Sequence, residues 1–286
     1  MIAYRRSVKI DPMRWIRRLL AVSFLLLVLF FVFSKSLNEP QKNEFLSPTP
    51  TPTATPLSSF SFAIISDIHS DYQSLQKSLN KIRADGAEFI IVAGDLTTVG
   101  NKKELARVKD ILERSGLDYY VIPGNHDLWS TKSGEDPFRE VFGQDYQSFQ
   151  KGQIKFILVN NGDGLVGVDE AQEKWLKREL VDCPKLYCLV FAHMPLNHSL
   201  LAHVMGEDNS RVASQAARLV KELVGAKVRE LFAGHIHYLS SYELDGLKTT
   251  TDGAIYTDKG NQPARFLEVS VSLPEVKLEK KRVWVE

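Results

Sequence analysis

The 286-residue sequence contains little cysteine. Its two cysteines, Cys183 and Cys188, are separated by only four residues. An oxidising compartment would permit a disulfide between them. Cys188, however, lies in the apolar run LYCLVFA, where a small buried thiol is common. We therefore expect two free thiols, with the disulfide as the alternative.

An excess of basic residues is also missing from most of the chain. Residues 1–18 hold six Lys and Arg against one acidic residue, a net charge of +5, which leaves 30 basic and 34 acidic residues for the remainder. Proteins that bind nucleic acid usually present a basic face. No nucleic-acid-binding patch is therefore evident, and the basic N-terminus needs another explanation.

Charged residues are absent from Leu19 to Phe33, a run of fifteen residues. A membrane-spanning helix needs about 20 apolar residues, and flanking Lys and Arg can lengthen a short span by snorkelling. We expect residues 19–37 to form a transmembrane signal anchor. The alternative is a signal peptide cleaved near Ser34-Lys35-Ser36. The basic residues 1–18 predict a cytoplasmic N-terminus, so the rest of the chain is either tethered outside the cytoplasm by a single span or secreted.

A proline-rich segment follows the apolar run. Residues 47–59, SPTPTPTATPLSS, cannot build a core and favour extended polyproline II. At ~3.1 Å per residue this segment could span ~40 Å. We interpret residues 38–59 as a linker. Residues 60–286 then form one domain, because no second linker divides them and their number is ample for one core.

Short apolar runs alternate with amphipathic segments from residue 60 onward. The runs predict strands at 60–66, 88–94, 118–124, 186–192 and 228–234. Apolar residues at helical spacing predict helices at 72–82, 105–112, 170–180 and 210–225, the third begun by Asp169 with Gln172 as its capping-box partner. Residues 236–286 suggest several further β segments. Alternating strands and helices with a β-rich end predict an α/β fold with mixed sheets.

Residues that can bind metal ions follow each of the five predicted strands. In chain order they are Asp67 and His69, then Asp95, then Asn125 with His126 and Asp127, then His193, and finally His235 and His237. Ligands of α/β sheets bind beyond the carboxyl ends of the strands. Taken singly, each residue is more often a turn, a cap or a core residue. Buried together they must be hydrogen-bonded or neutralised, and mixed nitrogen and oxygen ligands suit two divalent ions among Mn, Fe, Zn, Co and Ni.

The motifs D-x-H (67–69), G-D (94–95), G-N-H-D (124–127), His193 and G-H-x-H (234–237) resemble, in order, those of the calcineurin-like metallophosphoesterase superfamily. The resemblance spans about residues 60–240. It implies a four-layer αββα sandwich with mixed β-sheets, here preceded by the N-terminal transmembrane segment. It also implies a dinuclear metal site. By this resemblance Asp67, His69 and His237 bind one metal ion, Asn125, His193 and His235 bind the other, and Asp95 bridges them. His126 is the implied catalytic histidine, and Asp127 the residue that orients it.

The resemblance implies hydrolysis of a phosphoester substrate, by in-line attack of a hydroxide shared between the two metal ions. Thr98 stands where the purple acid phosphatase branch has a tyrosine ligand, which argues against an iron–tyrosinate site. The substrate stays open between a phosphomonoester and a diester or pyrophosphate of nucleotides or phospholipid headgroups, and a non-catalytic scaffold is a further alternative. We expect His198 and His203 to be exposed loop histidines, or else substrate contacts on a lid.

Overall fold

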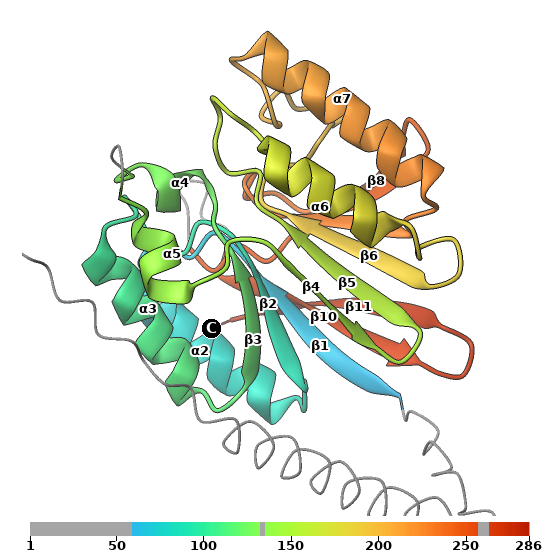
Figure 1. The fold of residues 1–286 in the computed structure, drawn as a ribbon. Coiled ribbons are helices and arrows are strands. Elements are labelled where there is room, and N and C mark those ends of the chain that lie inside the picture. Colours follow the sequence, from blue (N-terminus) through green and yellow to red (C-terminus); the bar gives the residue numbers. More distant parts are fainter. Residues whose placement is uncertain (1–58, 132–134, 257–262, 286) are drawn as a thin grey trace, which may run out of the picture. The chain divides into compact units, whose positions relative to one another are not determined.

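The computed structural model describes residues 59–131, 135–256 and 263–285 (Figure 1). The predicted anchor at residues 19–37 and nearly all of the predicted linker lie outside these residues. Within the described ranges, no helix is both long enough and apolar enough to cross a bilayer. The predictions of a membrane span and of its orientation therefore stay predictions.

The first sheet has the strand order β11-β10-β1-β2-β3. Three predicted strands form its parallel part, namely β1 (Phe60–Ile65), β2 (Phe89–Ala93) and β3 (Asp118–Ile122). The C-terminal strands β10 (Arg265–Ser272) and β11 (Lys277–Trp284) continue the sheet in antiparallel pairing. Ile64 lies opposite Ile91 on one side and Leu267 on the other, so the end of the chain packs beside the start of the domain.

The second sheet has the order β4-β5-β6-β7-β9-β8 and is also mixed. Its predicted strands are β6 (Tyr187–Ala192) and β7 (Glu230–Ala233), and the predicted β-rich tail supplies β8 (Ser240–Leu244) and β9 (Leu247–Thr251). The other two, β4 (Gln147–Lys151) and β5 (Ile154–Val159), were not predicted from the sequence. β5 pairs in parallel with β6. All five predicted strands are therefore present, and β4 and β5 are additional strands between the third and the fourth of them in the chain.

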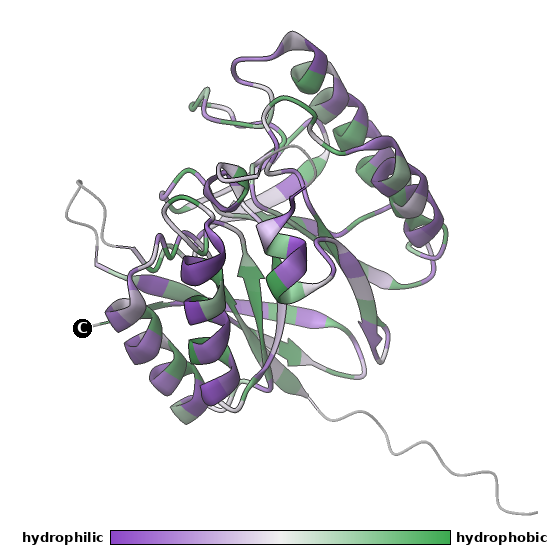
Figure 2. Ribbon diagram, turned by 60° about the vertical axis from the view of Figure 1, so that its left-hand side comes forward, coloured by the Kyte–Doolittle hydropathy of each residue, from purple (hydrophilic) through white to green (hydrophobic). Residues whose placement is uncertain are grey.

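Helices cover the outer face of each sheet (Figure 1). The first sheet carries α2 (Tyr72–Ala84), α3 (Lys102–Arg114) and α5 (Pro137–Phe142), and the second carries α6 (Glu170–Leu180) and α7 (Ser210–Gly225). The long helices are amphipathic, and Figure 2 shows hydrophobic and hydrophilic residues alternating along them. Each begins at an Asp or Asn whose side chain accepts backbone N–H groups, as expected of good N-caps.

Three clusters of buried apolar side chains hold these layers together. One lies between the first sheet and its helices and a second between the other sheet and α6 and α7. The third lies between the two sheets and is rich in phenylalanine. Within it the Phe62 ring stacks on Phe89 at 5.1 Å and meets Phe156 edge-on at 5.3 Å, measured between ring centroids. The layers therefore follow one another as helix, sheet, sheet and helix.

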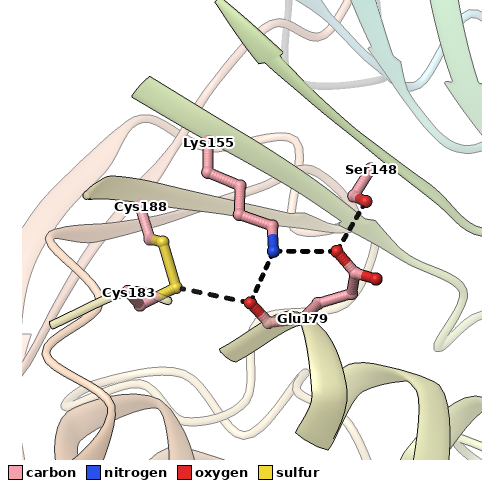
Figure 3. Close-up of a disulfide and its surroundings, with 5 residues drawn as sticks. All are labelled: Ser148, Lys155, Glu179, Cys183 and Cys188. Carbon is pink, nitrogen blue, oxygen red and sulfur yellow. Dashed lines mark hydrogen bonds and ion pairs between the residues drawn. A yellow bond between two sulfur atoms is a disulfide. The ribbon is translucent and has the colours of Figure 1, made fainter. Parts of the chain in front are cut away.

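Cys183 and Cys188 form a disulfide (Figure 3), so the expectation of free thiols was wrong. The chain reverses direction between α6 and β6, which brings the two Cα atoms to 5.3 Å, within the range a disulfide spans. Beside the bridge, Lys155 donates to the Glu179 backbone carbonyl at 2.7 Å and pairs with its carboxylate at 2.9 Å. Ser148 donates to the same carboxylate at 2.8 Å. These contacts join β4 and β5 to the end of α6.

Candidate metal centre

The seven proposed metal ligands converge beyond the carboxyl ends of the parallel strands, where the backbone turns sharply. Eight non-glycine residues of the described chain have a positive φ, and five of them are proposed ligands. These five are Asp67 (49°), His69 (44°), Asp95 (53°), His235 (68°) and His237 (50°). A left-handed backbone is costly for residues with a Cβ and concentrates at functional sites. The turns thus aim these side chains inward at a local cost that the surrounding packing offsets.

Two motif glycines leave room for these side chains. A Cβ added to Gly94 would lie 2.5 Å from the His193 ring, and one added to Gly124 would lie 2.1 Å from Asp95 Oδ1. Both glycines are therefore required by the close approach of a proposed ligand.

Asp67, His69 and His237 form the first group of ligand atoms. The Nε2 atoms of His69 and His237 are 3.0 Å apart, and His237 Nε2 lies 3.3 Å from Asp67 Oδ1. The Asp67 carboxylate also accepts the backbone N–H of His235 at 3.0 Å, which ties the first strand end to the last. Burial opposes ionisation of Asp67, but hydrogen bonding and charge from His237 outweigh it and hold its pKa below the usual range.

Asp95, His193 and His235 form the second group, and Asn125 adjoins it. His193 Nε2 lies 3.3 Å from Asp95 Oδ2, 3.2 Å from His235 Nδ1 and 3.1 Å from Asn125 Oδ1. Its other nitrogen, Nδ1, donates to the Ala93 carbonyl at 2.9 Å. Such a bond to a backbone carbonyl is the usual way in which a protein orients a histidine that binds metal.

Asp95 connects the two groups through a single oxygen. Its Oδ2 lies 3.6 Å from His69 Nε2 and 3.3 Å from His193 Nε2, while its Oδ1 accepts the backbone N–H of His126 at 2.9 Å. The structure therefore brings all seven predicted ligands together and places Asp95 between the two sets, as a bridging ligand requires.

The donor set fits divalent cations. In each group the carboxylate oxygens and imidazole nitrogens lie within 4.8 Å of one another, and a bound cation would satisfy these polar atoms where they are buried. Burial lowers the pKa of His193, but the Asp95 carboxylate outweighs it and raises the pKa to about 9. Burial and the His193 charge lower the pKa of His235 to about 3. Asp95 and its surroundings thus stabilise a positive charge at His193, while His235 beside it stays neutral. Histidine binds metal in its neutral form.

His126 lies at the edge of this centre and is oriented by a backbone group. Its Nδ1 lies 2.8 Å from the Thr98 carbonyl. A carbonyl oxygen only accepts, so Nδ1 carries the proton and Nε2 is left facing the centre, 4.0 Å from Asp95 Oδ2. The Trp129 ring covers the imidazole at 3.6 Å between centroids.

Asp127, the residue predicted to orient His126, does so through the backbone and not through a bond to the imidazole. Its fully buried carboxylate instead accepts the backbone N–H groups of Leu96, Thr97 and Gly124 and the Thr97 hydroxyl, all within 3.0 Å. Burial and the Asp95 charge raise the pKa of Asp127 to about 7. Asp127 therefore holds the loop that presents the Thr98 carbonyl to His126, and acts on the imidazole through the backbone.

One positioning residue was missed because β5 was missed. Asn161, fully buried just after β5, accepts the backbone N–H groups of His193 and Met194 and donates to the Met194 carbonyl. Gln172 does not close the predicted capping box; its side-chain amide pairs with the Asn160 backbone, while its own N–H bonds Asp169. The sequence signal was present, since the apolar run Ile154–Val159 ends at Asn160-Asn161 as the other strands end at their ligands.

A cavity of about 670 Å³ opens beside the centre and shares Asn125 and His235 with it. Trp129 and His203 also line it. His203 is exposed, as expected of a loop histidine, but its ring stacks on His235 at 4.0 Å and its Nδ1 pairs with Glu207 at 2.6 Å. His198 belongs to none of the ligand groups; it is only partly exposed and bonds Ser240 at 3.1 Å.

The fold gathers these candidate metal ligands at the ends of its parallel strands, and comparison with known families identifies the class of protein. The model of the calcineurin-like phosphoesterase family matches residues 60–239. The chain belongs to this family, which confirms the predicted family and the predicted class of enzyme, a phosphoester hydrolase.

Several similar proteins are named for an activity. Human serine/threonine-protein phosphatase CPPED1 is 25% identical over 231 residues, covering 73% of this chain and 72% of the relative. A probable glycerophosphodiester phosphodiesterase GpdQ of Arcobacter nitrofigilis is 24% identical, covering 61% and 65%. A probable cyclic nucleotide phosphodiesterase of Rhodococcus erythropolis is 31% identical, covering 60% of each. Among solved structures, the purple acid phosphatase PPD1 of yellow lupin has a TM-score of 0.58 at 14% identity, over 79% of this chain and 52% of that one. At that identity the likeness concerns the fold alone.

Proposed function

We propose that the chain is a metal-dependent phosphodiesterase tethered to the outer face of a membrane. The observation that carries the catalytic part is the position of Asp95 Oδ2, within 3.6 Å of a nitrogen ligand from each group. Asp67, His69 and His237 would hold one divalent ion, Asn125, His193 and His235 the other, with Asp95 shared. Two such ions supply charge stabilisation to the phosphoryl oxygens and lower the pKa of the attacking water.

The chain's own residues then position the substrate and manage the proton. Because Nδ1 keeps its proton in the bond to the Thr98 carbonyl, His126 can gain and release a further proton only at Nε2, the atom that faces the centre. A protonated Nε2 can donate to the oxygen of the leaving group as its bond to phosphorus breaks. Thr98 also donates from its hydroxyl to the His69 carbonyl at 3.0 Å, so one residue supports both the catalytic histidine and a ligand loop.

The cavity supports a diester rather than a monoester. Its described lining contains six carboxylic acids and no Lys or Arg. A phosphomonoester dianion brings more negative charge into such a cavity than a diester monoanion does, and repulsion grows with charge. The volume of about 670 Å³ also leaves room for a leaving group larger than the phosphoryl group alone. Two of the three relatives described above are named as diesterases.

The catalytic test compares two chromogenic esters with the full-length protein in detergent and Mn²⁺. We expect a higher kcat/KM on bis(p-nitrophenyl) phosphate than on p-nitrophenyl phosphate. His126→Ala should lower turnover ~10²–10⁴-fold while the metal content stays the same. His198→Ala, at a histidine that belongs to none of the ligand groups, serves as the matched control. Inactivity toward both esters across several metals would favour the non-catalytic scaffold and count against an enzyme.

The tether rests on the charge and hydropathy of residues 1–37, and the disulfide between Cys183 and Cys188 supports an oxidising compartment. Protease added to intact cells should digest the domain after residue 60, and the N-terminal sequence of the purified protein distinguishes an anchor from a cleaved signal peptide. Full protection of the domain in cells whose cytoplasmic membrane is intact, with any outer barrier opened to the protease, would contradict the proposed orientation.

A further inference from the structure

Most of the exposed apolar side chains lie on loops at the same sheet edge as the metal centre. The described chain exposes ten large hydrophobic side chains, and eight of them lie on loops that follow the strands at this edge. The two others, Val181 and Trp284, lie at the end of α6 and at the end of β11. Scattered exposed hydrophobics are ordinary, whereas an apolar patch concentrated at one face marks an interaction surface.

Six of these side chains form what we call the apolar rim: Trp129, Leu165, Val166, Leu200, Leu201 and Tyr238. Trp129 covers His126, and Tyr238 directly follows His237. Leu165 and Val166 line the 670 Å³ cavity together with Asn125. The rim therefore belongs to the loops that build the catalytic centre.

Hydrogen bonds hold the most exposed rim residues in place. The backbone N–H groups of Leu165 and Val166 both donate to Asp163 Oδ1, at 2.8 and 2.9 Å, and Arg211 donates to the Leu165 carbonyl. The N–H groups of Leu200 and Leu201 donate to His198 Nδ1, at 3.1 and 3.0 Å. These bonds keep Leu165 and Leu200 outward, with 76% and 88% of their surface exposed.

The sequence before the domain indicates what the rim meets. The predicted anchor, residues 19–37, is separated from Phe60 by 22 residues, which at full extension would reach ~73 Å. β1 begins at the edge opposite the centre, and a linker of this length would let either edge of the domain face the membrane. A tether also raises the effective concentration of the rim at the bilayer, so that a weak apolar contact suffices.

The charge of the cavity lining indicates which kind of membrane surface the apolar rim can contact. The cavity lining holds six acidic residues and no Lys or Arg; even with Arg139 paired to Asp145 and Arg211 bonded to the Leu165 carbonyl, this group of residues has a net negative charge, which disfavours a strongly anionic surface. A zwitterionic lipid surface offers apolar contact without that repulsion.

We propose that the apolar rim docks on a zwitterionic lipid bilayer, with the catalytic cavity opening toward the lipid headgroups. This inference rests on the tether in the proposed function, not on the choice between diester and monoester. A lipid bilayer would explain why these apolar side chains are exposed, whereas binding of a soluble phosphoprotein or nucleotide would not require them.

The test places an environment-sensitive fluorophore on single cysteines in the full-length protein, reconstituted in phosphatidylcholine vesicles. Because the two native cysteines are bridged to each other, Leu165→Cys and Leu200→Cys each supply a single free thiol. Val181→Cys, at a site 71% exposed but outside the rim, is the matched control. We expect blue-shifted emission and several-fold stronger quenching by nitroxide-labelled lipid at positions 165 and 200 than at 181.

A second variant tests whether the rim acts as one surface. In the Leu165→Cys protein, Leu200→Asp should reduce quenching of the label, while Val181→Asp should leave it unchanged. Equal quenching at 165, 200 and 181 would overturn the docking proposal, and the rim would then serve another partner. Carbonate extraction and hydrolysis of the soluble diester, measured on the same samples, report separately on the tether and on catalysis. Quenching of the fluorophores tests the docking proposal independently of the results of these two controls.

Discussion

Arg265 donates from Nη2 to the backbone carbonyl of His237 at 2.7 Å, and so supports a proposed metal ligand from a strand near the end of the chain. The same guanidinium pairs through Nε with Asp252 Oδ1 at 2.9 Å, and both side chains are 99% buried. Asp252 also contacts Arg282 at 3.3 Å. Arg265 and Asp252 lie beyond residues 60–239, the part that the family model matches. The C-terminal strand β10 is therefore a structural support of the metal centre.

Replacing Arg265 with Met should weaken both folding and metal retention. The change leaves the buried Asp252 with only Arg282, and breaking a buried pair costs about 3 kcal/mol or more. Loss of support for the His237 loop should reduce metal affinity ~10–100-fold. Urea unfolding and metal content after dialysis measure the two effects. Arg282→Met, at a half-buried position, is the control and should cost less; equal losses in both variants would contradict a special role for Arg265.

Replacing Asp127 with Asn should impair the enzyme through the loop at residues 96–98. One amide oxygen cannot serve all the donors that the carboxylate now accepts, and its NH₂ group would face backbone N–H groups. We expect a loss of about 1–3 kcal/mol in the free energy of unfolding and a lower kcat. Thr97→Ala removes one of these donors and should have a smaller effect. An unchanged urea midpoint for Asp127→Asn would argue against this supporting role.

Gly124→Ala should displace a metal ligand without altering any charge. The new methyl group would lie 2.1 Å from Asp95 Oδ1, so Asp95 or the loop must move. We expect reduced metal content and reduced activity. Gly225→Ala is the matched control, because at the end of α7 no atom lies within 4 Å of the added Cβ. That variant should be as stable as the wild type or slightly more so, and equal behaviour of the two variants would refute the steric argument.

Glu179 should contribute stability that depends on pH. Burial raises its pKa, but hydrogen bonds from Lys155 and Ser148 outweigh this and lower it below the ordinary value of 4.5. A carboxyl with a depressed folded-state pKa stabilises the protein above its unfolded-state pKa, and this contribution is lost as pH falls through the folded-state pKa. Glu179→Gln should thus cost about 1–3 kcal/mol near pH 7, and the difference from wild type should shrink below a pH of about 4.5. The exposed Glu170→Gln is the control, and a pH-independent difference for Glu179→Gln would contradict the linkage.

The ligand set could be predicted from the sequence because each ligand follows an apolar run, and parallel strands deliver their carboxyl ends to one edge. His193 was predicted in this way from the run before it. Asn161 follows the same rule after β5, yet one polar amide after an unassigned run carried too little signal. The partner of His126 was unpredictable for a different reason. Adjacent residues suggest a contact, but Asp127 points into the loop after β2, and the Thr98 carbonyl takes its expected place.

By itself, the sequence determined the five strands that precede the ligands, the long amphipathic helices, the seven candidate ligands and the family, because these depend on local patterns of polarity along the chain. Only the tertiary structure decided which distant groups meet. It paired Cys183 with Cys188 through the turn after α6, placed Asp95 between two ligand groups, and brought Arg265 beneath His237. Such contacts depend on strand order and register, which arise from packing across the whole domain and leave no local mark in the residues that make them.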